Sequence, residues 1–338
     1  MLVMKNVFFF DSTLRDGSHA LRQQLLPEHI EAYCRKIDNA GMYTVIIGHG
    51  NGLGASSILM TRSAMPEMDM VKLAGENLKR TKLGVFVTVG FGTIEDHIQP
   101  SMDLGAKVFC IASHCTEANT MIRHIKYISQ RGKECYGVLM NSHMPSPEKL
   151  LEQAKIIEDN GADGIILMDS AGAYTPERTE RVFSLLFGQL GIKIGFHPHN
   201  NLSMAVSNAY TAVRCGASVI DGTIRGFGSG AGNCQLEALA ALLEKEGYET
   251  GTDLYQMLDA GDEVIEGLIG YAKGVDGISI VSGSSGVVST FKHEVVRLSR
   301  INEVDPRDVF CELGRRRAIS GQDDLIFEAV QFLKSKKH

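Results

Sequence analysis

The chain has 338 residues, a hydrophobic fraction of 44% and a formal net charge of −6. This length and apolar content suit a large folded core, and they exclude a disordered chain or a small domain held together by disulfides. The basic residues are scattered through a net-acidic sequence, so we expect neither nucleic acid nor a membrane surface as a partner.

Apolar, β-branched segments recur through the first two thirds of the chain, with amphipathic segments between them. Their apolarity is continuous rather than alternating, which is typical of strands that are covered on both faces. We expect eight such strands, at residues 7–10, 43–47, 83–89, 108–112, 136–140, 164–168, 192–196 and 218–221.

The intervening segments are predicted to be helices. Residues 27–40, 147–160 and 176–190 each begin with proline at a first-turn position, and glycine often stands where a helix should end. Alternating strands and helices with short links favour parallel pairing, and eight such units predict an α/β fold, a (β/α)8 TIM barrel. We place this catalytic barrel at residues 1–250.

Beyond about Gly251 the pattern changes to helices alone, expected at residues 254–268, 290–301, 306–313 and 322–334. The last helix carries an apolar stripe that must be buried against the barrel, its own segment or a partner. Packing within the chain is the default expectation. We therefore expect residues 251–338 to form a mostly helical C-terminal extension.

Polar residues follow the predicted strands, where the mouth of such a barrel carries its active site. Lysines stand instead at the strand beginnings, at positions 82, 107, 133 and 193, which argues against a Schiff-base enzyme. The residues expected at the mouth are Asp16, His19, His49, His114, His143, Asp169, His197, His199 and Arg225.

His197 and His199 are separated by one residue at the end of the seventh predicted strand, so both imidazoles can point to the same face of that strand. Alone, such a pair is more often hydrogen-bonded or exposed, and Arg15 with Asp16 could be a structural ion pair. The barrel brings the first and seventh strands to one mouth, where Asp16, His197 and His199 can hold a divalent cation. Asn233 could add an amide oxygen. Without a thiolate, the set favours Mn²⁺ or Mg²⁺, with Co²⁺ and other divalent metals as alternatives.

Arg15 beside such a cation would stabilise the enolate that forms when a carbon–carbon bond of a 2-oxo acid breaks. His19 is close enough in sequence to act as the base for a 4-hydroxyl group. Ser170 either binds the substrate carboxylate or belongs to a simple turn. The glycine-rich loop 226–233 lacks a phosphate-binding signature, so we expect it to approach the metal or substrate closely.

Several motifs together resemble the 4-hydroxy-2-oxovalerate aldolases, and the resemblance runs almost from end to end. These are class II pyruvate aldolases of the HMG-CoA lyase-like, or DRE-TIM metallolyase, group, which also includes isopropylmalate synthase. The motifs lie at residues 11–20, 49–54, 113–117, 168–172, 195–199, 228–233, 312–316 and 321–324.

The resemblance implies a manganese-dependent retro-aldol cleavage of a 4-hydroxy-2-oxo acid to pyruvate and a short aldehyde. Asp16, His197 and His199 would be the metal ligands, Arg15 would stabilise the pyruvate enolate, and His19 would transfer protons. It also implies that the C-terminal region docks an acylating aldehyde dehydrogenase, which takes up the aldehyde through a channel. We further expect a homo-oligomer.

Four departures from the family pattern concern the aldehyde end of the site. Family members carry tyrosines in the stretch that corresponds to residues 284–288, and this chain has none there. It has Pro198 and Asn200 where glycine and histidine are usual, and Gln23 where histidine is usual. We therefore expect pyruvate-enolate chemistry with an altered set of groups around the aldehyde.

Two other functions remain open at this point. One is an acyl-CoA-dependent, Claisen-type synthase that acts on a 2-oxo acid, although no acyl-CoA site is evident. The other is a catalytically altered barrel that only binds a dehydrogenase. The seven cysteines contain no paired motif and no secretory signal precedes the first strand, so we expect reduced thiols and a cytoplasmic location.

Overall fold

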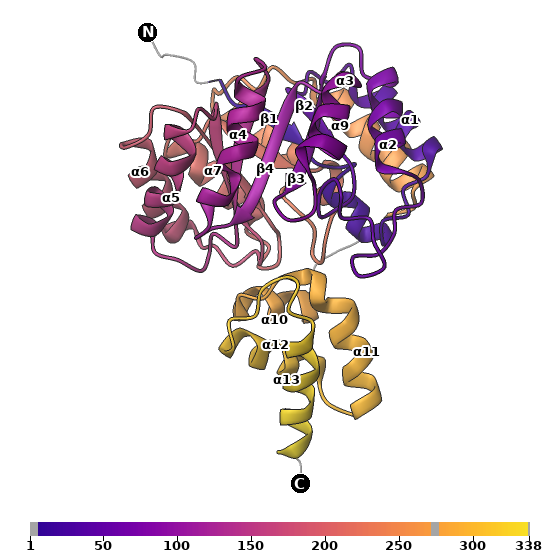
Figure 1. Cartoon of the computed structure of the whole chain (residues 1–338), viewed down its shortest axis with the longest axis vertical. Helices are drawn as coiled ribbons and strands as arrows, with labels where there is room; N and C mark the ends of the chain where they lie inside the picture. Colours follow the sequence, from indigo (N-terminus) through magenta and orange to yellow (C-terminus); the bar gives the residue numbers. More distant parts are fainter. Residues whose placement is uncertain (1–5, 272–276, 337–338) are drawn as a thin grey trace.

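The computed structural model describes residues 6–271 and 277–336. Its centre is a closed barrel of parallel strands in chain order, in which β8 pairs back onto β1 (Figure 1). The predicted (β/α)8 barrel is therefore confirmed. The strands are β1 (Phe8–Asp11), β2 (Thr44–Ile47), β3 (Lys82–Thr88), β4 (Val108–His114), β5 (Glu134–Met140), β6 (Gly164–Asp169), β7 (Lys193–Pro198) and β8 (Val219–Gly222).

Helices surround this barrel (Figure 1). The prolines expected at helix starts do open three of them, and the side chains of Ser146 and Thr175 cap two of these by accepting backbone N–H groups. The helices are α1 (Pro27–Ile37), α2 (Glu67–Asn77), α3 (Gln99–Asp103), α4 (Ile122–Ser129), α5 (Pro147–Asp159), α6 (Pro176–Phe187), α7 (Ala205–Arg214) and α8 (Leu236–Lys245).

Two apolar layers hold the barrel together. Side chains such as Phe10, Tyr136 and Ile166 fill the interior. A larger layer, which includes Phe9 and Phe196, lies between the strands and the surrounding helices. Because both faces of each strand are covered, successive residues are buried, and this accounts for the continuous apolar runs in the sequence.

Strand β7 continues two residues beyond its expected end. His197 and Pro198 pair in register with Met168 and Asp169 of β6, so the ladder holds the chain extended to this point. His197 therefore lies within the strand, and His199 follows it directly at the barrel mouth.

The helix expected at 254–268 is present as α9 (Leu254–Ala260) followed by the π-helical turns of η5 (Gly261–Leu268). Both elements contact α1. The side chains of Met257, Ala260 and Ile265 are buried in the same apolar layer that covers the strands. This part of the chain thus packs with the barrel.

The remaining helices, α10 to α13, form a separate bundle that we call the C-terminal helical unit. It has its own apolar core, and Ile326, Ala329 and Val330 of the last helix are buried there. The stripe on that helix is therefore covered by its own segment. The unit consists of α10 (Gly277–Ser285), η6 (Ser289–Phe291), α11 (Lys292–Asn302), α12 (Pro306–Arg315) and α13 (Asp324–Ser335).

Helix α10 was not expected from the sequence. Its glycines, serines and β-branched residues are weak helix formers, so local propensity does not favour a helix there. The helix packs against α12, and this tertiary contact stabilises it.

The C-terminal helical unit lies against the carboxyl-end mouth of the barrel, below it in Figure 1. Asn201 Nδ2 donates a hydrogen bond to Ser289 Oγ (2.7 Å), and His143 Nε2 lies 3.1 Å from the carbonyl oxygen of Gly286. These contacts place residues 288–290 and 319–321 over the polar side chains of the mouth.

Two further expectations concern the whole chain. Lysine side chains do stand at the amino end of the barrel, where Lys82 and Lys193 open their strands. All seven cysteines are free thiols, and most are buried. Among the residues described, none of the helices has the length and apolarity needed to cross a membrane.

Candidate metal centre and active site

Three buried side chains from opposite ends of the barrel sequence converge at the mouth. Asp16 opens the short helix η1 (Asp16–Leu21) after β1, His197 lies in β7, and His199 follows that strand. Their potential ligand atoms all lie within 4.8 Å of one another. A carboxylate and two imidazoles at this spacing could hold one divalent cation.

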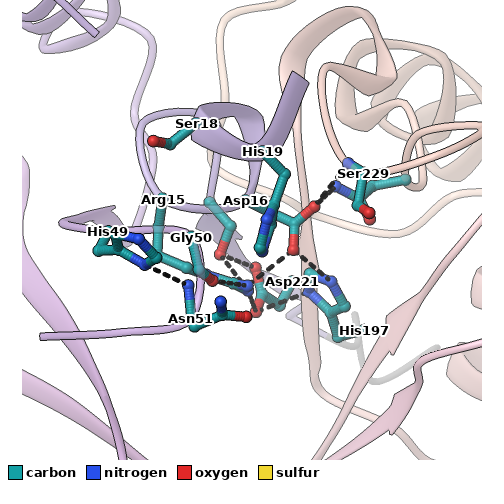
Figure 2. A network of polar contacts seen from close by, with 12 residues as sticks. Arg15, Asp16, Ser18, His19, His49, Gly50, Asn51, His197, Asp221 and Ser229 are labelled. Atoms are coloured by element: carbon teal, nitrogen blue, oxygen red, sulfur yellow. Dashed lines mark hydrogen bonds and ion pairs between the residues drawn. The ribbon is translucent and has the colours of Figure 1, made fainter. Parts of the chain in front are cut away.

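The Asp16 carboxylate is fixed on both of its oxygens (Figure 2). Oδ1 accepts hydrogen bonds from the Ser229 backbone N–H (3.1 Å) and from Asn233 Nδ2 (2.8 Å). Oδ2 lies 2.7 Å from Arg15 Nη1 and 3.8 Å from His197 Nε2. Burial acts to raise the pKa of Asp16, but the Arg15 guanidinium and the neighbouring imidazoles outweigh it and hold that pKa below its ordinary value.

The two imidazoles carry buried nitrogens that make no hydrogen bond within residues 6–271 and 277–336. These are both ring nitrogens of His197 and Nδ1 of His199, and the buried Oδ1 of Asn233 is in the same condition. Burial lowers the pKa of His199 to about 3, so this ring is neutral near pH 7. Neutral imidazole nitrogens and an amide oxygen that lack partners fit a site made for a cation.

His197 is oriented by a carboxylate that the sequence analysis did not single out. Nδ1 of His197 lies 2.9 Å from Asp221 Oδ2, although the N–H bond is not well directed at that oxygen. The other oxygen of Asp221 accepts a hydrogen bond from Ser12 Oγ (2.6 Å). The signal in the sequence was a single acidic residue within the apolar run of β8.

Arg15 is almost fully buried, with 2% of its surface exposed. Nη1 contacts Asp16 and lies 3.3 Å from the Gly50 carbonyl oxygen, and Nη2 lies 3.3 Å from Ser12 Oγ. The guanidinium carbon is 4.5 Å from the centre of the Phe86 ring. Arg15 and Asp16 therefore do form an ion pair, and both residues line the cavity of the mouth.

The glycine-rich loop approaches Asp16 closely. A Cβ atom at Gly228 would lie 2.2 Å from Asn233 Nδ2 and 2.7 Å from Asp16 Oδ1, so only glycine fits there. This approach allows the next backbone N–H, that of Ser229, to reach the carboxylate.

His19 and Gln23 lie side by side at one edge of the cavity. Gln23 Nε2 is 3.2 Å from His19 Nδ1, and a Cβ atom at Gly50 would lie 2.6 Å from His19 Nε2. Burial is the main cause that lowers the pKa of His19, and the Asp16 carboxylate partly opposes it. The imidazole is therefore held next to the metal ligands.

Ser170 is part of a turn and also lines the cavity. Gly172 N–H donates to the Asp169 carbonyl (3.0 Å), which closes the turn, and Ser170 Oγ accepts a hydrogen bond from the Asn141 backbone N–H (2.9 Å). The hydroxyl hydrogen of Ser170 remains available to a ligand.

Other polar residues expected at the mouth have structural contacts. Nε2 of His49 lies 3.0 Å from the carbonyl oxygen of Thr61, and His143 contacts Gly286 as described above. Arg225 pairs with Glu266 (2.9 Å) on the outer side of the barrel. The sequence could not separate these residues from the cluster around Asp16.

A cavity of about 220 Å³ lies above the cluster. Its lining includes Arg15, Asp16, His19 and His199, together with apolar side chains such as Phe86 and Phe91. The C-terminal helical unit covers part of it through residues 288–290 and 319–321. The remaining lining residues include Met60, Thr88, His114, Met140, Asn141, Met168, Ser170, Val288, Ser289, Thr290, Ile319, Ser320 and Gly321.

Two family models match this chain, one over the barrel and one over the C-terminal helical unit. The family model described as HMGL-like matches residues 6–264, and a second, described as a DmpG-like communication domain, matches residues 274–335. The 4-hydroxy-2-oxovalerate aldolase of Pectobacterium atrosepticum is 46% identical over 332 residues, which are 98% of this chain and 97% of that protein. The enzyme of the same name from Spirochaeta aurantia is 49% identical over 330 residues, with coverage of 98% and 97%.

Solved structures agree with the fold. The carboxyl transferase domain of Rhizobium etli pyruvate carboxylase superposes with a TM-score of 0.82 at 15% identity, covering 99% of this chain and 61% of that chain. At that identity the likeness concerns the fold alone. The family matches and the full-length relatives go further, and they show that the chain belongs to the 4-hydroxy-2-oxovalerate aldolase family.

Proposed function

We propose that this chain catalyses the divalent-metal-dependent retro-aldol cleavage of a 4-hydroxy-2-oxo acid, such as 4-hydroxy-2-oxovalerate, to pyruvate and a short aldehyde. The observation that carries the proposal is the buried cluster of Asp16, His197 and His199 beside a small cavity, in which His197 Nε2 and His199 Nδ1 make no hydrogen bond with any residue that the structure describes. The full-length relatives that bear the aldolase name support the same reaction.

Asp16, His197 and His199 would hold the cation, and Asn233 Oδ1 is a further candidate ligand. When bound, the cation would polarise the 2-keto oxygen of the substrate. Carboxylate, imidazole and amide donors without sulfur favour Mn²⁺, with Mg²⁺ or Co²⁺ as alternatives.

Arg15 is the group that we assign to the charge of the enolate. Cleavage of the bond between C3 and C4 moves an electron pair onto the 2-keto oxygen, and a guanidinium fixed beside the cavity would stabilise that negative charge. Contacts with Asp16, Gly50 and Ser12 hold Arg15 in place before substrate arrives, so little reorganisation is needed.

His19 is the group that we assign to proton transfer, and Ser170 to the substrate carboxylate. His19 borders the cavity beside Asp16, where an imidazole can exchange a proton with the 4-hydroxyl group. The Ser170 hydroxyl can donate to a carboxylate because its oxygen already accepts a backbone hydrogen bond.

The aldehyde half of the substrate would then lie toward the C-terminal helical unit, whose residues 288–290 and 319–321 line the cavity. The match of residues 274–335 to a communication domain supports a role for this unit in docking a second protein. We propose an acylating aldehyde dehydrogenase as that protein, within an assembly that contains several copies of the chain.

A lactate-dehydrogenase-coupled pyruvate assay tests the reaction directly. A panel of 4-hydroxy-2-oxo acids is supplied with and without Mn²⁺, and we expect pyruvate from at least one substrate only when the metal is present. Thiol release from acetyl-CoA plus a 2-oxo acid would favour a synthase instead. Absence of pyruvate with every substrate and metal would contradict the proposal.

A further inference from the structure

We propose that Gln23 is a positioning residue that holds His19 in the neutral tautomer with its proton on Nε2, and that it thereby restrains the proton transfer assigned to His19. The tautomer follows from hydrogen bonds alone. Its consequence for catalysis rests on the function proposed above.

The orientation of the Gln23 amide is fixed by two contacts at its oxygen. Oε1 accepts hydrogen bonds from the Gly50 backbone N–H (2.8 Å) and from Ser18 Oγ (2.6 Å). A backbone N–H can only donate, so the atom that faces Gly50 must be the amide oxygen. The NH₂ group of Gln23 therefore points the other way.

That NH₂ group faces His19. Its nitrogen is 3.2 Å from His19 Nδ1, and an amide NH₂ group donates and does not accept. Nδ1 must therefore be the acceptor, and the single proton of the neutral ring lies on Nε2. A proton on Nδ1 would set two N–H groups against each other in a buried place.

The backbone around Gln23 is held in an unusual conformation. Arg22 and Gln23 are consecutive non-glycine residues with φ angles of 51° and 64°, in the left-handed region. Gln23 N–H donates to the Ser18 carbonyl (2.7 Å), and Ala64 N–H donates to the Gln23 carbonyl (3.1 Å). With 3% of its surface exposed, Gln23 is fixed at both its backbone and its side chain.

This arrangement limits how His19 can serve as a base. With the proton on Nε2 and Nδ1 occupied by Gln23, neither nitrogen is free to accept the 4-hydroxyl proton. Uptake at Nε2 requires the ring first to reach the Nδ1–H tautomer, and the Gln23 amide opposes that form. Gln23 thus opposes the change of tautomer that His19 needs before it can accept a proton at Nε2.

Nitrogen NMR on protein labelled with ¹⁵N-histidine tests the tautomer without substrate. The spectra are taken on metal-free or Mg²⁺-loaded protein, because Mn²⁺ would broaden the signals, and His19→Asn identifies the resonance. Only Nε2 correlates strongly with both ring C–H protons, so the spectrum shows which nitrogen is protonated. We expect Nε2–H in the wild type, and Nδ1–H there would overturn the inference.

Gln23→Glu is the informative variant. It keeps the side-chain length and an acceptor for Gly50 and Ser18, and it replaces the NH₂ donor with an acceptor. Nδ1 of His19 should therefore carry a proton in this variant. An unchanged tautomer in this variant would also overturn the inference. Gln23→Met, which has neither donor nor acceptor there, should give a mixture of the two forms.

Gln24→Glu is the matched control. It makes the same change of charge at the neighbouring position, but Gln24 is exposed and its amide donates to the carbonyl of Arg62 (2.9 Å). We expect the wild-type tautomer and the wild-type rate. A tautomer change in this control would show that charge, rather than the hydrogen bond from Gln23, sets the form, and the inference would fail.

Kinetics then separate this inference from the proposed function. If His19 is the base, Gln23→Glu should raise kcat for cleavage by up to about tenfold, a factor that corresponds to ~1.4 kcal/mol, with KM nearly unchanged. An inverted tautomer with a lower kcat would uphold the role of Gln23 and contradict the base role of His19. A wild type without aldolase activity would refute the proposed function and leave the NMR result to decide the tautomer.

Discussion

The two ends of the barrel each carry a charged cluster, and the two clusters differ in how far their buried polar atoms are hydrogen-bonded or ion-paired. At the amino end, Lys82 Nζ lies 2.6 Å from Glu134 Oε1, and Tyr43 donates to the same carboxylate at 2.5 Å. At the carboxyl end, both oxygens of Asp16 have partners, while His197 and His199 keep buried nitrogens to which no described residue is hydrogen-bonded. Buried groups without hydrogen bonds among the described residues, rather than charge itself, therefore distinguish the mouth from the amino end.

The clusters also differ in their access to water. The side chains of Lys82 and Glu134 are 33% and 26% exposed, whereas those of Arg15 and Asp16 are 3% exposed each. Charges act more strongly on one another in the buried cluster because water does not screen them there. The amino-end cluster should therefore affect stability slightly, and the mouth cluster should control metal binding and rate.

The largest effect is expected from Asp16→Asn, which removes the only carboxylate among the proposed ligands. Metal and pyruvate formation should be lost together, because two imidazoles alone hold a hard cation poorly. Elemental analysis after dialysis gives the metal content, and the coupled assay gives the rate. Full activity without bound metal would refute the ligand assignment, while Glu134→Gln at the opposite end should leave both quantities unchanged.

Arg15→Ala should retain metal and lose about 10²–10³ in kcat, as is typical when one preorganised charge stabiliser is removed. The variant leaves the Asp16 carboxylate without the Arg15 guanidinium, so the thermal stability of the variant is measured in parallel. A near-normal kcat would exclude the enolate role, whatever the effect on stability. Arg15→Lys, which keeps the charge but loses the bidentate geometry, should recover only part of the rate.

Asp221→Asn should weaken metal binding by about 10–100-fold, the usual result of removing a carboxylate that orients a histidine ligand. The amide can still accept the hydrogen bond from Ser12, so the fold should remain. Titration of the metal-free protein with Mn²⁺ measures the affinity. An affinity equal to that of the wild type would show that Asp221 does not orient His197.

The smallest effect is expected at the amino end. Lys82→Met or Glu134→Gln should change the free energy of unfolding by only about 0.2–1 kcal/mol, because the pair is partly exposed. Metal content and kcat should equal those of the wild type. Denaturant unfolding and the coupled assay measure the two quantities, and a large loss of activity would contradict the division between the two ends.

Much of the fold was accessible from the sequence because its signals are local. Continuous apolar runs marked the strands, and prolines at first-turn positions marked α1, α5 and α6. Helix α10 was not predicted because tertiary contacts, chiefly with α12, rather than local propensity, favour a helix there. The end of β7 was placed too early because its pairing with β6, rather than apolarity, extends it through His197.

Some residues of the site were likewise predictable from the sequence, and others were not. In the predicted barrel the first and seventh strands end at one mouth, and Asp16, His197 and His199 do converge there. Asp221 was overlooked because it ends an apolar strand without any local motif. The contact between Gln23 and His19 also escaped notice, because it depends on a backbone N–H from another loop, at Gly50, that fixes the amide.

By itself, the sequence determined the periodicity of strands and helices, the family motifs and the chemical types available at the mouth, since each of these depends on residues close together in the chain. Only the tertiary structure decided which imidazole nitrogens of the mouth make no hydrogen bond with a described residue, which carboxylate faces His197 and which way the Gln23 amide points. Those properties depend on distances and directions between segments far apart in sequence, and no local pattern encodes them.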